Sequence, residues 1–438
     1  MTQPNIGSAQ RNRLKGNFDM TPHSAPIAHD ALILGLDFGT SGLRAHLVRQ
    51  QQTLASYQSP IALPQREGQH SQQATALWQA GLQNLLAQLQ QHGWSAQVEH
   101  IIADATSSTV LLDSAPDHAL MYDDRRAQQQ AQRIAQIAPA TSGAHGASST
   151  LAKVMWLEQR YRPGRILHQI DWLNQQLCAH PVATDENNAL KLGYDPQNRC
   201  WPDWITSLIT SPLPPVVPAG TPIGETSPAL SRDWGFRPHT PVYSGTTDSI
   251  AAFLASGAQH NGDAVSALGS TLAIKLLSSK PIFASEYGLY SHRLRHQWLI
   301  GGASNSGGAV LLHHFSLQQL NQLLPQLNIH QPSGLACYPL ISPGERFPIA
   351  DAQLAPILPN TKDKRLFLHA LIEGLVEIEN LAYQRLHQLG APALRQIYSV
   401  GGGTQNQPWM QLRQARLPAP LAKAQSQAAA FGVTRLLY

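Results

Sequence analysis

The chain has 438 residues, of which 13% are charged and 42% are hydrophobic. This length and composition are typical of a folded protein with two or three domains and a substantial core. The formal net charge is only +4 and the basic residues are dispersed, so we predict no nucleic-acid partner. The three cysteines are far apart and form no C-x-x-C pair, which indicates neither a disulfide framework nor a zinc site and favours a reducing cytoplasm.

No uninterrupted apolar stretch is long enough to span a bilayer, so we predict no membrane partner. Residues 1–30 are polar, carry Arg11, Arg13 and Lys15, and lack the apolar core of a secretory signal. We therefore predict a disordered N-terminal tail over residues 1–30 in a cytoplasmic protein, with Met20 as a second candidate for the true start.

Residues 31–48 predict a β-hairpin that could hold a phosphate. The apolar run 31–36 is typical of a buried strand and ends at Asp37, and the residues after the turn alternate between apolar and polar as a second strand does. A second strand follows where dinucleotide loops and P-loops need a helix, and neither glycine pattern fits. The turn amides and the Asp37 carboxylate could therefore surround a metal-bound phosphate, and the alternative is an ordinary hairpin turn. The turn consists of glycine and hydroxyl residues, Gly39, Thr40, Ser41 and Gly42.

Strands and helices alternate along the rest of the chain, which favours an α/β fold. The segment 72–91 has leucine and tryptophan residues at helical spacing and predicts an amphipathic core helix. Residues 98–113 predict a strand, a hydroxyl-rich loop and a returning strand, and residues 149–159 predict a helix with Thr150 as its N-cap.

The second half of the chain repeats the opening pattern. The proline-rich segment 211–222 precedes a predicted domain boundary at residue 240, and residues 242–248 predict a strand and polar turn that end at Asp248, before a helix. Residues 265–275 again predict two strands joined by a turn of glycine and hydroxyl residues, Gly269, Ser270 and Thr271. Two such hairpins imply two related lobes that face one nucleotide, although coincidence between two common turns is the alternative.

Near the end of the chain, residues 396–400 predict a strand that runs into three glycines and then a helix over 408–415. Three consecutive glycines let the backbone approach a flat ligand, and the N-terminus of a helix favours anions. The alternative is a flexible turn between a strand and a helix.

Taken together and in this order, these segments resemble the FGGY carbohydrate kinases, members of the actin-like ATPase superfamily, over residues 31–438. The resemblance implies an α/β fold of two actin-like ATPase (ribonuclease H-like) domains with the active site in the cleft between them, which we place at residues 31–240 and 241–438. It rests on two phosphate motifs, an adenosine motif and a signature helix, at residues 37–42, 267–271, 401–409 and 148–157.

Within the family, the nearest likeness is to the D-ribulose kinases once called xylulose-kinase-like. Many xylulose kinases carry a Met-His pair where this chain has Thr106 and Ser107, so the substrate preference should differ. The chain departs from the family pattern at three positions, Asp123, Arg160 and Gln427.

The resemblance also assigns roles to individual residues. Asp248 matches the catalytic base, for which a helix cap is the alternative, and Asp37 is expected to hold Mg²⁺ through water. The expected sugar-binding residues are Asp37, Ser107 and Asp248, with Asp124 and Arg126 as weaker candidates that could instead form an exposed ion pair. The expected ATP-binding residues are Thr40, Ser41, Gly269, Ser270, Thr271, Asn305, Gly402, Gly403 and Asn406.

The sequence thus predicts an ATP- and Mg²⁺-dependent kinase of a free ketopentose, with D-ribulose as the expected acceptor and D-ribulose 5-phosphate as the product. A kinase for D-xylulose, L-ribulose or a polyol remains an alternative, and so does an ATP-switched binding protein without transfer activity. The expected partners are the sugar and ATP, in a monomer or a small homo-oligomer.

Overall fold

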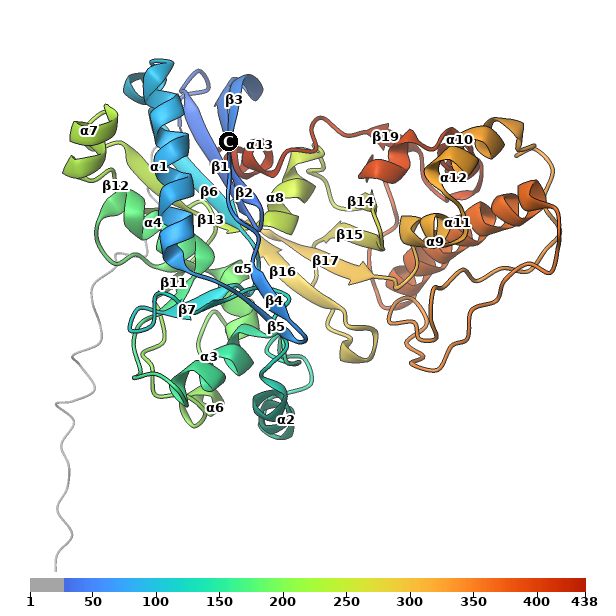
Figure 1. Cartoon of the computed structure of the whole chain (residues 1–438), viewed down its shortest axis with the longest axis horizontal. Helices are drawn as coiled ribbons and strands as arrows, with labels where there is room; N and C mark the ends of the chain where they lie inside the picture. Colours follow the sequence, from blue (N-terminus) through green and yellow to red (C-terminus); the bar gives the residue numbers. More distant parts are fainter. Residues whose placement is uncertain (1–26) are drawn as a thin grey trace, which may run out of the picture.

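The computed structural model describes residues 27–438, so the tail predicted for residues 1–30 and the candidate start at Met20 lie almost wholly outside the described residues. The described chain folds into two α/β lobes, which lie side by side in Figure 1. Over these residues, no helix combines the length and apolar character needed to cross a bilayer. The lobes confirm the α/β class predicted from the alternation of strands and helices.

The first lobe is built on a six-stranded sheet in which three neighbouring strands are parallel. Its strands, in spatial order, are β12 (Pro222–Glu225), β13 (Pro241–Thr247), β6 (His100–Ala105), β1 (Ile33–Gly39), β2 (Gly42–Arg49) and β3 (Gln52–Pro60). Alternate residues of β1 enter different cores, because Leu34 packs with one layer of helices and Ile33 with the other. The first layer is α1 (Thr75–Gln91) and α4 (Gln169–Cys178), and the second is α8 (Asp248–Ala255) and α13 (Ala429–Thr434).

A smaller, second sheet extends the first lobe around its own hydrophobic core. Its strands are β4 (Gln65–Glu67), β5 (His70–Gln73), β8 (Ala119–Leu120), β7 (Val110–Leu112) and β9 (Ile166–His168). Helices α2 (Gln128–Ile137), α3 (Thr150–Glu158) and α6 (Asp203–Thr206) lie near this sheet, and short elements complete the lobe: β10 (Thr184–Asp185), α5 (Glu186–Ala189), β11 (Val216–Val217) and α7 (Pro228–Trp234).

Two local predictions in this region need correction. The strand predicted to return after the hydroxyl-rich loop is β7, which pairs with β8 and β9 in the smaller sheet rather than with β6. The N-cap of α3 is Ser149, whose hydroxyl accepts a hydrogen bond from the backbone N–H of Ala152 at 3.2 Å. Thr150 instead pairs its hydroxyl with that of Ser108, so it is not free to cap the helix.

The second lobe has a six-stranded sheet whose core includes the 25-residue helix α11 (Lys364–Gln388). Its strands, in spatial order, are β16 (Tyr290–Leu294), β17 (Gln297–Ala303), β15 (Leu272–Ser278), β14 (Asp263–Leu268), β18 (Gln396–Val400) and β19 (Leu421–Lys423). The other helices of this lobe are α9 (Gly308–His314), α10 (Leu317–Leu323) and α12 (Gln407–Arg416).

The two lobes repeat one arrangement of strands. In each, an antiparallel hairpin has a parallel strand beside its first arm: β6 lies beside β1, and β18 lies beside β14. The sequence therefore predicted both hairpins in their correct places, and the repetition extends to the strand that neighbours them.

The sheets divide the chain later than the boundary predicted at residue 240. Strand β13 pairs in parallel with β6, where Val242 lies opposite Ile101, and both side chains enter the first lobe's core. Helix α8 follows directly, and the second sheet begins only at Asp263. The boundary was predicted from the local sequence pattern of a strand, a polar turn and an acid. That pattern contains no information about the pairing of β13 with β6, which is distant in the sequence.

Helix α13 brings the end of the chain back against the first lobe and packs very closely there. A Cβ atom placed on Gly432 would lie 1.9 Å from the carbonyl oxygen of Ala251 in α8, and one on Gly35 of β1 would lie 1.9 Å from that of Ala430. Both glycines are therefore required by the backbone-to-backbone contact that joins β1, α8 and α13.

We predict that Gly432→Ala lowers the free energy of unfolding by about 1–3 kcal/mol, because the new methyl group overlaps a backbone oxygen that cannot rotate away. Urea denaturation followed by circular dichroism measures the change. Gly402→Ala is the matched control, since nothing lies within 4 Å of a Cβ at that position. Equal unfolding midpoints for the two variants would contradict the close contact.

Candidate active site

Three carboxyl groups meet at one edge of the first sheet. Asp37 is near the end of β1, Asp104 near the end of β6, and Asp248 directly follows β13. These three strands are adjacent and parallel, so their carboxyl ends lie at the same edge. Asp37 and Asp104 are opposite each other in register, which places their side chains on the same face about 5 Å apart along the hydrogen-bonding direction.

Asp37 is almost buried, with 7% of its surface exposed. Burial raises the pKa of its carboxyl group, and the neighbouring guanidinium of Arg44 opposes that rise. Arg44 lies opposite Asp37 on β2, and its Nη1 donates a hydrogen bond to Asp37 Oδ2 at 3.0 Å. Thr40 is half-buried and Ser41 is exposed at the turn that follows.

Asp104 was not predicted as a site residue, yet it is the most deeply buried of the three acids. Its side chain is fully enclosed, and no donor group among residues 27–438 reaches either carboxyl oxygen. Burial, followed by the charges of Asp37 and Asp248, raises its pKa well above the ordinary value. Its position at a strand end before a hydroxyl-rich loop was the only signal in the sequence.

Asp248 is the first residue of α8, and the N-cap position belongs to Thr247. Its Oδ1 accepts a hydrogen bond from the backbone N–H of the next residue, Ser249, at 2.6 Å. Burial and the charge of Asp37 raise the pKa of Asp248 to about 6, and Lys275 and Lys191 oppose that rise. The carboxylate does not occupy the helix-cap position that was its alternative role.

Lys275 connects this group of acids to the second lobe. It lies on β15, and its Nζ donates a hydrogen bond to the carbonyl oxygen of Ser249, next to Asp248. Burial lowers the pKa of Lys275 to about 7. A cavity of about 180 Å³ lies beside this contact and is lined by Ser249, Lys275, His292 and the glycine pair at 301–302. Asp248 therefore lies where the lobes meet.

The hydroxyl-rich loop after β6 leaves one hydroxyl group free. Thr106 bonds to Thr109 and Gln169, and Ser108 bonds to Ser148 and Thr150. Within the described residues the hydroxyl of Ser107 forms no hydrogen bond, and the residue is half-buried. This arrangement suits the predicted role of Ser107 in sugar binding, because its hydroxyl is available to a ligand.

A buried ammonium group holds that loop in place. Lys153 of α3 is fully buried, and its Nζ donates hydrogen bonds to the carbonyl oxygens of Ser108 at 2.8 Å and Met121 at 2.7 Å. Burial lowers the pKa of Lys153 to about 7. Ser108 has a left-handed φ of 71°, so the loop conformation needs such outside support.

Asp124 and Arg126 form a buried ion pair, which corrects the alternative of an exposed one. Arg126 Nη2 lies 2.8 Å from Asp124 Oδ2, with side-chain exposures of 6% and 0%. The same oxygen accepts the backbone N–H of Ser71 at 2.6 Å, and the guanidinium lies 4.9 Å from the ring centre of Trp156. The pair therefore braces β5 and α3, and whether it also touches a sugar stays a prediction.

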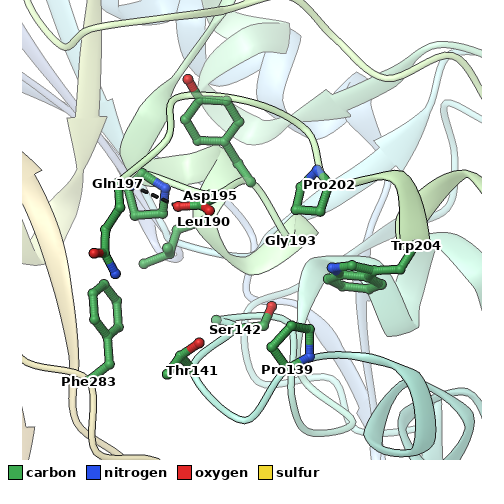
Figure 2. Close-up of a pocket in the computed structure, with 13 residues that line it drawn as sticks. Pro139, Thr141, Ser142, Leu190, Gly193, Asp195, Gln197, Pro202, Trp204 and Phe283 are labelled. Atoms are coloured by element: carbon green, nitrogen blue, oxygen red, sulfur yellow. Dashed lines mark hydrogen bonds between the residues drawn. The ribbon is translucent and has the colours of Figure 1, made fainter.

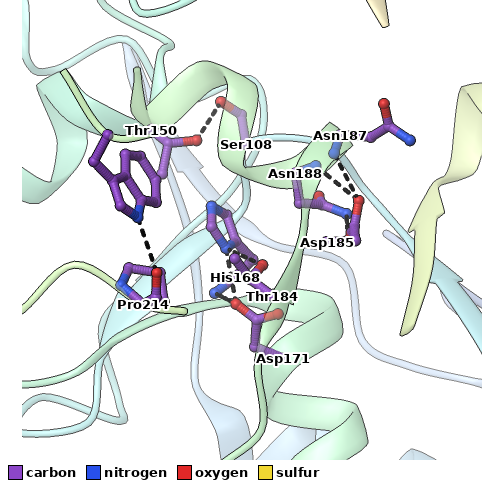
Figure 3. A network of polar contacts seen from close by, with 10 residues as sticks. Ser108, Thr150, His168, Asp171, Thr184, Asp185, Asn187, Asn188 and Pro214 are labelled. Carbon is purple, nitrogen blue, oxygen red and sulfur yellow. Dashed lines mark hydrogen bonds and ion pairs between the residues drawn. The ribbon is translucent and has the colours of Figure 1, made fainter. Parts of the chain in front are cut away.

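A polar network lies beside β13, the strand that leads to Asp248 (Figure 3). Asp185 accepts hydrogen bonds at 2.9 Å and 3.0 Å from the backbone N–H groups of Asn187 and Asn188. Asn187 Nδ2 donates to the hydroxyl of Thr246 at 3.1 Å. This contact fixes β13 two residues before Asp248.

The predicted nucleotide-binding segments of the second lobe come together around the end of β14. Gly308 N–H donates to the carbonyl oxygen of Gly269 at 2.9 Å. A Cβ atom placed on Gly401 would lie 2.9 Å from the carbonyl oxygen of Leu268. Ser270 and Thr271 are exposed on the hairpin turn. The structure therefore brings the hairpin, the 301–308 loop and the glycine run to one place.

Four of the predicted ATP-binding residues differ in their surroundings. Asn406 caps α12, because its Oδ1 accepts the backbone N–H of Trp409 at 3.1 Å. Gly403 lacks room for a side chain beside Leu268, whereas Gly402 faces open space. Asn305 donates from its backbone N–H to Glu345 Oε1 at 2.7 Å and from Nδ2 to Gly344.

Gln427 stands where an acid is frequent in the family pattern, and its amide oxygen accepts the backbone N–H of Gly401 at 3.1 Å. The glutamine therefore orients the glycine run without a charge. Whether this run and Asn305 contact adenosine stays a prediction.

A separate small pocket of about 80 Å³ lies where Phe283 of the second lobe approaches the first lobe (Figure 2). Trp204, Gly193 and Asp195 line its first-lobe side, and Asp195 accepts the backbone N–H of Gln197 at 2.8 Å. None of the predicted site residues lines this pocket, so it is not part of the candidate active site.

Comparison with known proteins agrees with this architecture. The family model described as the N-terminal domain of the FGGY family of carbohydrate kinases matches residues 32–255, and that of the C-terminal domain matches residues 265–437. The boundary between the two family models agrees with the boundary between the two large sheets. It again places β13 and α8 in the first lobe.

Full-length relatives are similar at low identity. A xylulose kinase of Lactococcus lactis is 23% identical over 87% of this chain and 82% of its own length, and a xylulose kinase of Bacillus subtilis is 22% identical with the same coverage. A gluconokinase of Bacillus subtilis is 22% identical over 48% of this chain and 44% of its own length.

The fold is shared with solved sugar kinases. A xylulose kinase from Rhodospirillum rubrum aligns with a TM-score of 0.79 and 21% identity over 92% of this chain and 89% of its own. A gluconate kinase from Lactobacillus acidophilus aligns with a TM-score of 0.80 and 17% identity over 93% and 88%. With both domain models matched across nearly the whole described chain, this protein belongs to the FGGY family of carbohydrate kinases.

Proposed function

We propose that this sugar kinase transfers the γ-phosphoryl group of ATP to a hydroxyl group of a free ketopentose, and that D-ribulose is the acceptor. The observation that carries the proposal is Asp248, a carboxylate set beside Asp37 at the junction of the two lobes. The acceptor side rests on Ser107, the free hydroxyl in a loop where many xylulose kinases carry a Met-His pair.

In this reaction the acceptor hydroxyl forms a bond to the γ-phosphorus while the bond to the ADP oxygen breaks. The hydroxyl proton passes to the Asp248 carboxylate, which a pKa of about 6 leaves ionised at neutral pH. Arg44 forms an ion pair with Asp37, and Lys275 contacts the residue next to Asp248. Both cations would stabilise negative charge on the transferred oxygens.

The acids at this edge fit a magnesium ion held mainly by phosphates and water. Over residues 27–438 no three His, Cys, Asp or Glu side chains, the three acids included, are placed so that they could hold one metal ion together, so a cage made by protein alone is not available. Mg²⁺ needs only one or two carboxylates, and Asp37, with the unbonded Asp104 behind it, would supply them. When bound, the ion would neutralise phosphate charge. Thr40, Ser41, Gly269, Ser270 and Thr271 would donate to the phosphates.

D-Xylulose is the second candidate acceptor, because the full-length relatives at 22–23% identity are xylulose kinases. The two sugars differ in the configuration of one hydroxyl group, which polar side chains near Ser107 would distinguish. A panel of pentuloses and polyols, compared by kcat/KM in a coupled ADP-release assay, decides between them. No sugar-stimulated ADP release with any of them would reject the proposed function.

Asp248→Asn should lower kcat by on the order of 10²–10⁴-fold, because the amide keeps the shape of the side chain but cannot accept the proton. ATP binding, measured by calorimetry, should be unchanged. Asp233→Asn is the matched control, since Asp233 forms an exposed ion pair with Arg232 on α7. A turnover for Asp248→Asn close to that of the control would exclude Asp248 as the base.

Lys153→Met should raise the KM for the acceptor about tenfold or more while the KM for ATP stays nearly constant. The substitution leaves the carbonyl oxygens of Ser108 and Met121 without their donor and so releases the loop that carries Ser107. Lys280→Met, at an exposed lysine, is the control. If both KM values change equally, the lysine supports the fold in general and not the acceptor loop.

A further inference from the structure

A large cavity with a mixed polar and apolar lining lies far from the candidate active site. It measures about 520 Å³ and is formed by the β2–β3 turn, the loop after α8, the β16–β17 turn and the end of the chain. The C-terminus is marked C in Figure 1 and lies near β3 and α13. The side chains that carry the argument are Gln51, Gln259, His260, Arg295, His296 and Arg435.

This cavity is separated from the phosphate hairpin by the length of a strand. Strand β2 begins at Gly42, in the hairpin turn, and ends at Arg49, just before the cavity. Eight residues at about 3.4 Å each make this distance about 27 Å. No residue assigned above to the acceptor, the phosphates or the base lines the cavity.

Two guanidinium groups, those of Arg295 and Arg435, line this cavity. Arg435 is 8% exposed, and its Nη1 donates to the amide oxygen of Gln425. Arg295 Nη2 donates to the main-chain oxygens of Arg435, at 2.6 Å, and Tyr438. Over residues 27–438 neither arginine forms an ion pair with an aspartate or glutamate. Burial and then the charge of Arg295 lower the pKa of Arg435.

Asp263, which begins β14 directly after the loop that follows α8, is already engaged. Asp263 forms a 2.6 Å ion pair with Arg395 and accepts the backbone N–H groups of Gln259 and His260. A terminal carboxylate at Tyr438 would balance only one of the two guanidinium charges. The cavity thus keeps excess positive charge next to an arginine that is more than nine-tenths buried.

Holding the Arg435 charge away from water beside a second guanidinium group costs free energy that a bound anion would recover. The guanidinium group matches phosphate oxygens well, because its N–H donors form a planar fork. The lining also includes neutral amides and imidazoles, which suit the hydroxyl groups of a polyol, and leucine side chains, which suit its carbon skeleton. We propose that this cavity is a second ligand site, which binds the phosphate monoester of a small sugar or polyol.

The position of the site gives its occupant contact with both lobes. Gln51 belongs to a turn of the first sheet, whereas Arg295 belongs to the β16–β17 turn of the second. A ligand held between them would bind with different affinity when the lobes change their relative position, and by the same coupling it would change the affinity of the active site for its own ligands.

Calorimetric titration of the full-length protein with D-ribose 5-phosphate, with neutral D-ribose and inorganic phosphate as comparisons, tests the site. We expect the ester to bind more tightly than either, and Arg435→Gln and Arg295→Gln each to weaken it by about 10- to 100-fold. Arg44→Gln, in the candidate active site, and Arg232→Gln, in a surface ion pair, should leave the tight binding unchanged.

Arg295 is exposed, so its variant should fold even if Arg435→Gln does not. Unchanged ester affinity in Arg295→Gln, or loss of binding only in Arg44→Gln, would overturn the second site. Equal affinity for the ester and inorganic phosphate would overturn the assignment to a sugar phosphate. The titration needs no turnover, so its outcome is independent of whether the chain phosphorylates a ketopentose.

Discussion

The structure depends on one electrostatic constraint, which is the meeting of Asp37, Asp104 and Asp248 at the ends of three adjacent parallel strands. Burial raises the pKa of each carboxyl group, and repulsion from the neighbouring acids adds to the rise for Asp104 and Asp248. Such a group needs cations at close range, and the two hairpins supply them in the same way. Arg44 comes from the second strand of the first hairpin, and Lys275 comes from the second strand of the other.

This division of charge explains why two lobes are needed. The acids belong to the first lobe, but Lys275 belongs to the second. Its ammonium group is held next to Asp248 by a hydrogen bond to the carbonyl oxygen of Ser249. Buried polar contacts then fix the surroundings, since Lys153 supports the loop that carries Ser107 and Asn187 supports β13. The close contact of Gly432 with α8 keeps the chain's last helix against this assembly.

The sequence was most informative where structure is local. Both hairpins, α1 and the strand ending at Asp248 follow from short patterns of apolar, glycine and hydroxyl residues, and each lies where it was predicted. Asp104 and Lys275 were missed because their importance depends on contacts between distant segments, whereas Arg44 was missed although it lies opposite Asp37 in the same hairpin. The boundary at residue 240 was misplaced for the same reason, since only its pairing with β6 assigns β13 to the first sheet. Ser149 and Asn406 are the N-caps of α3 and α12. Each has polar neighbours that could also cap a helix, so the sequence pattern alone did not identify which residue forms the cap.

The central claim is that Asp248 serves phosphoryl transfer to a sugar and not hydrolysis of ATP. Mass spectrometry of the products formed from ATP and D-ribulose by the purified chain tests it most directly. The account predicts a pentulose phosphate monoester in a one-to-one ratio with ADP. ADP and inorganic phosphate beside unchanged D-ribulose, and beside every other pentulose supplied, would contradict it.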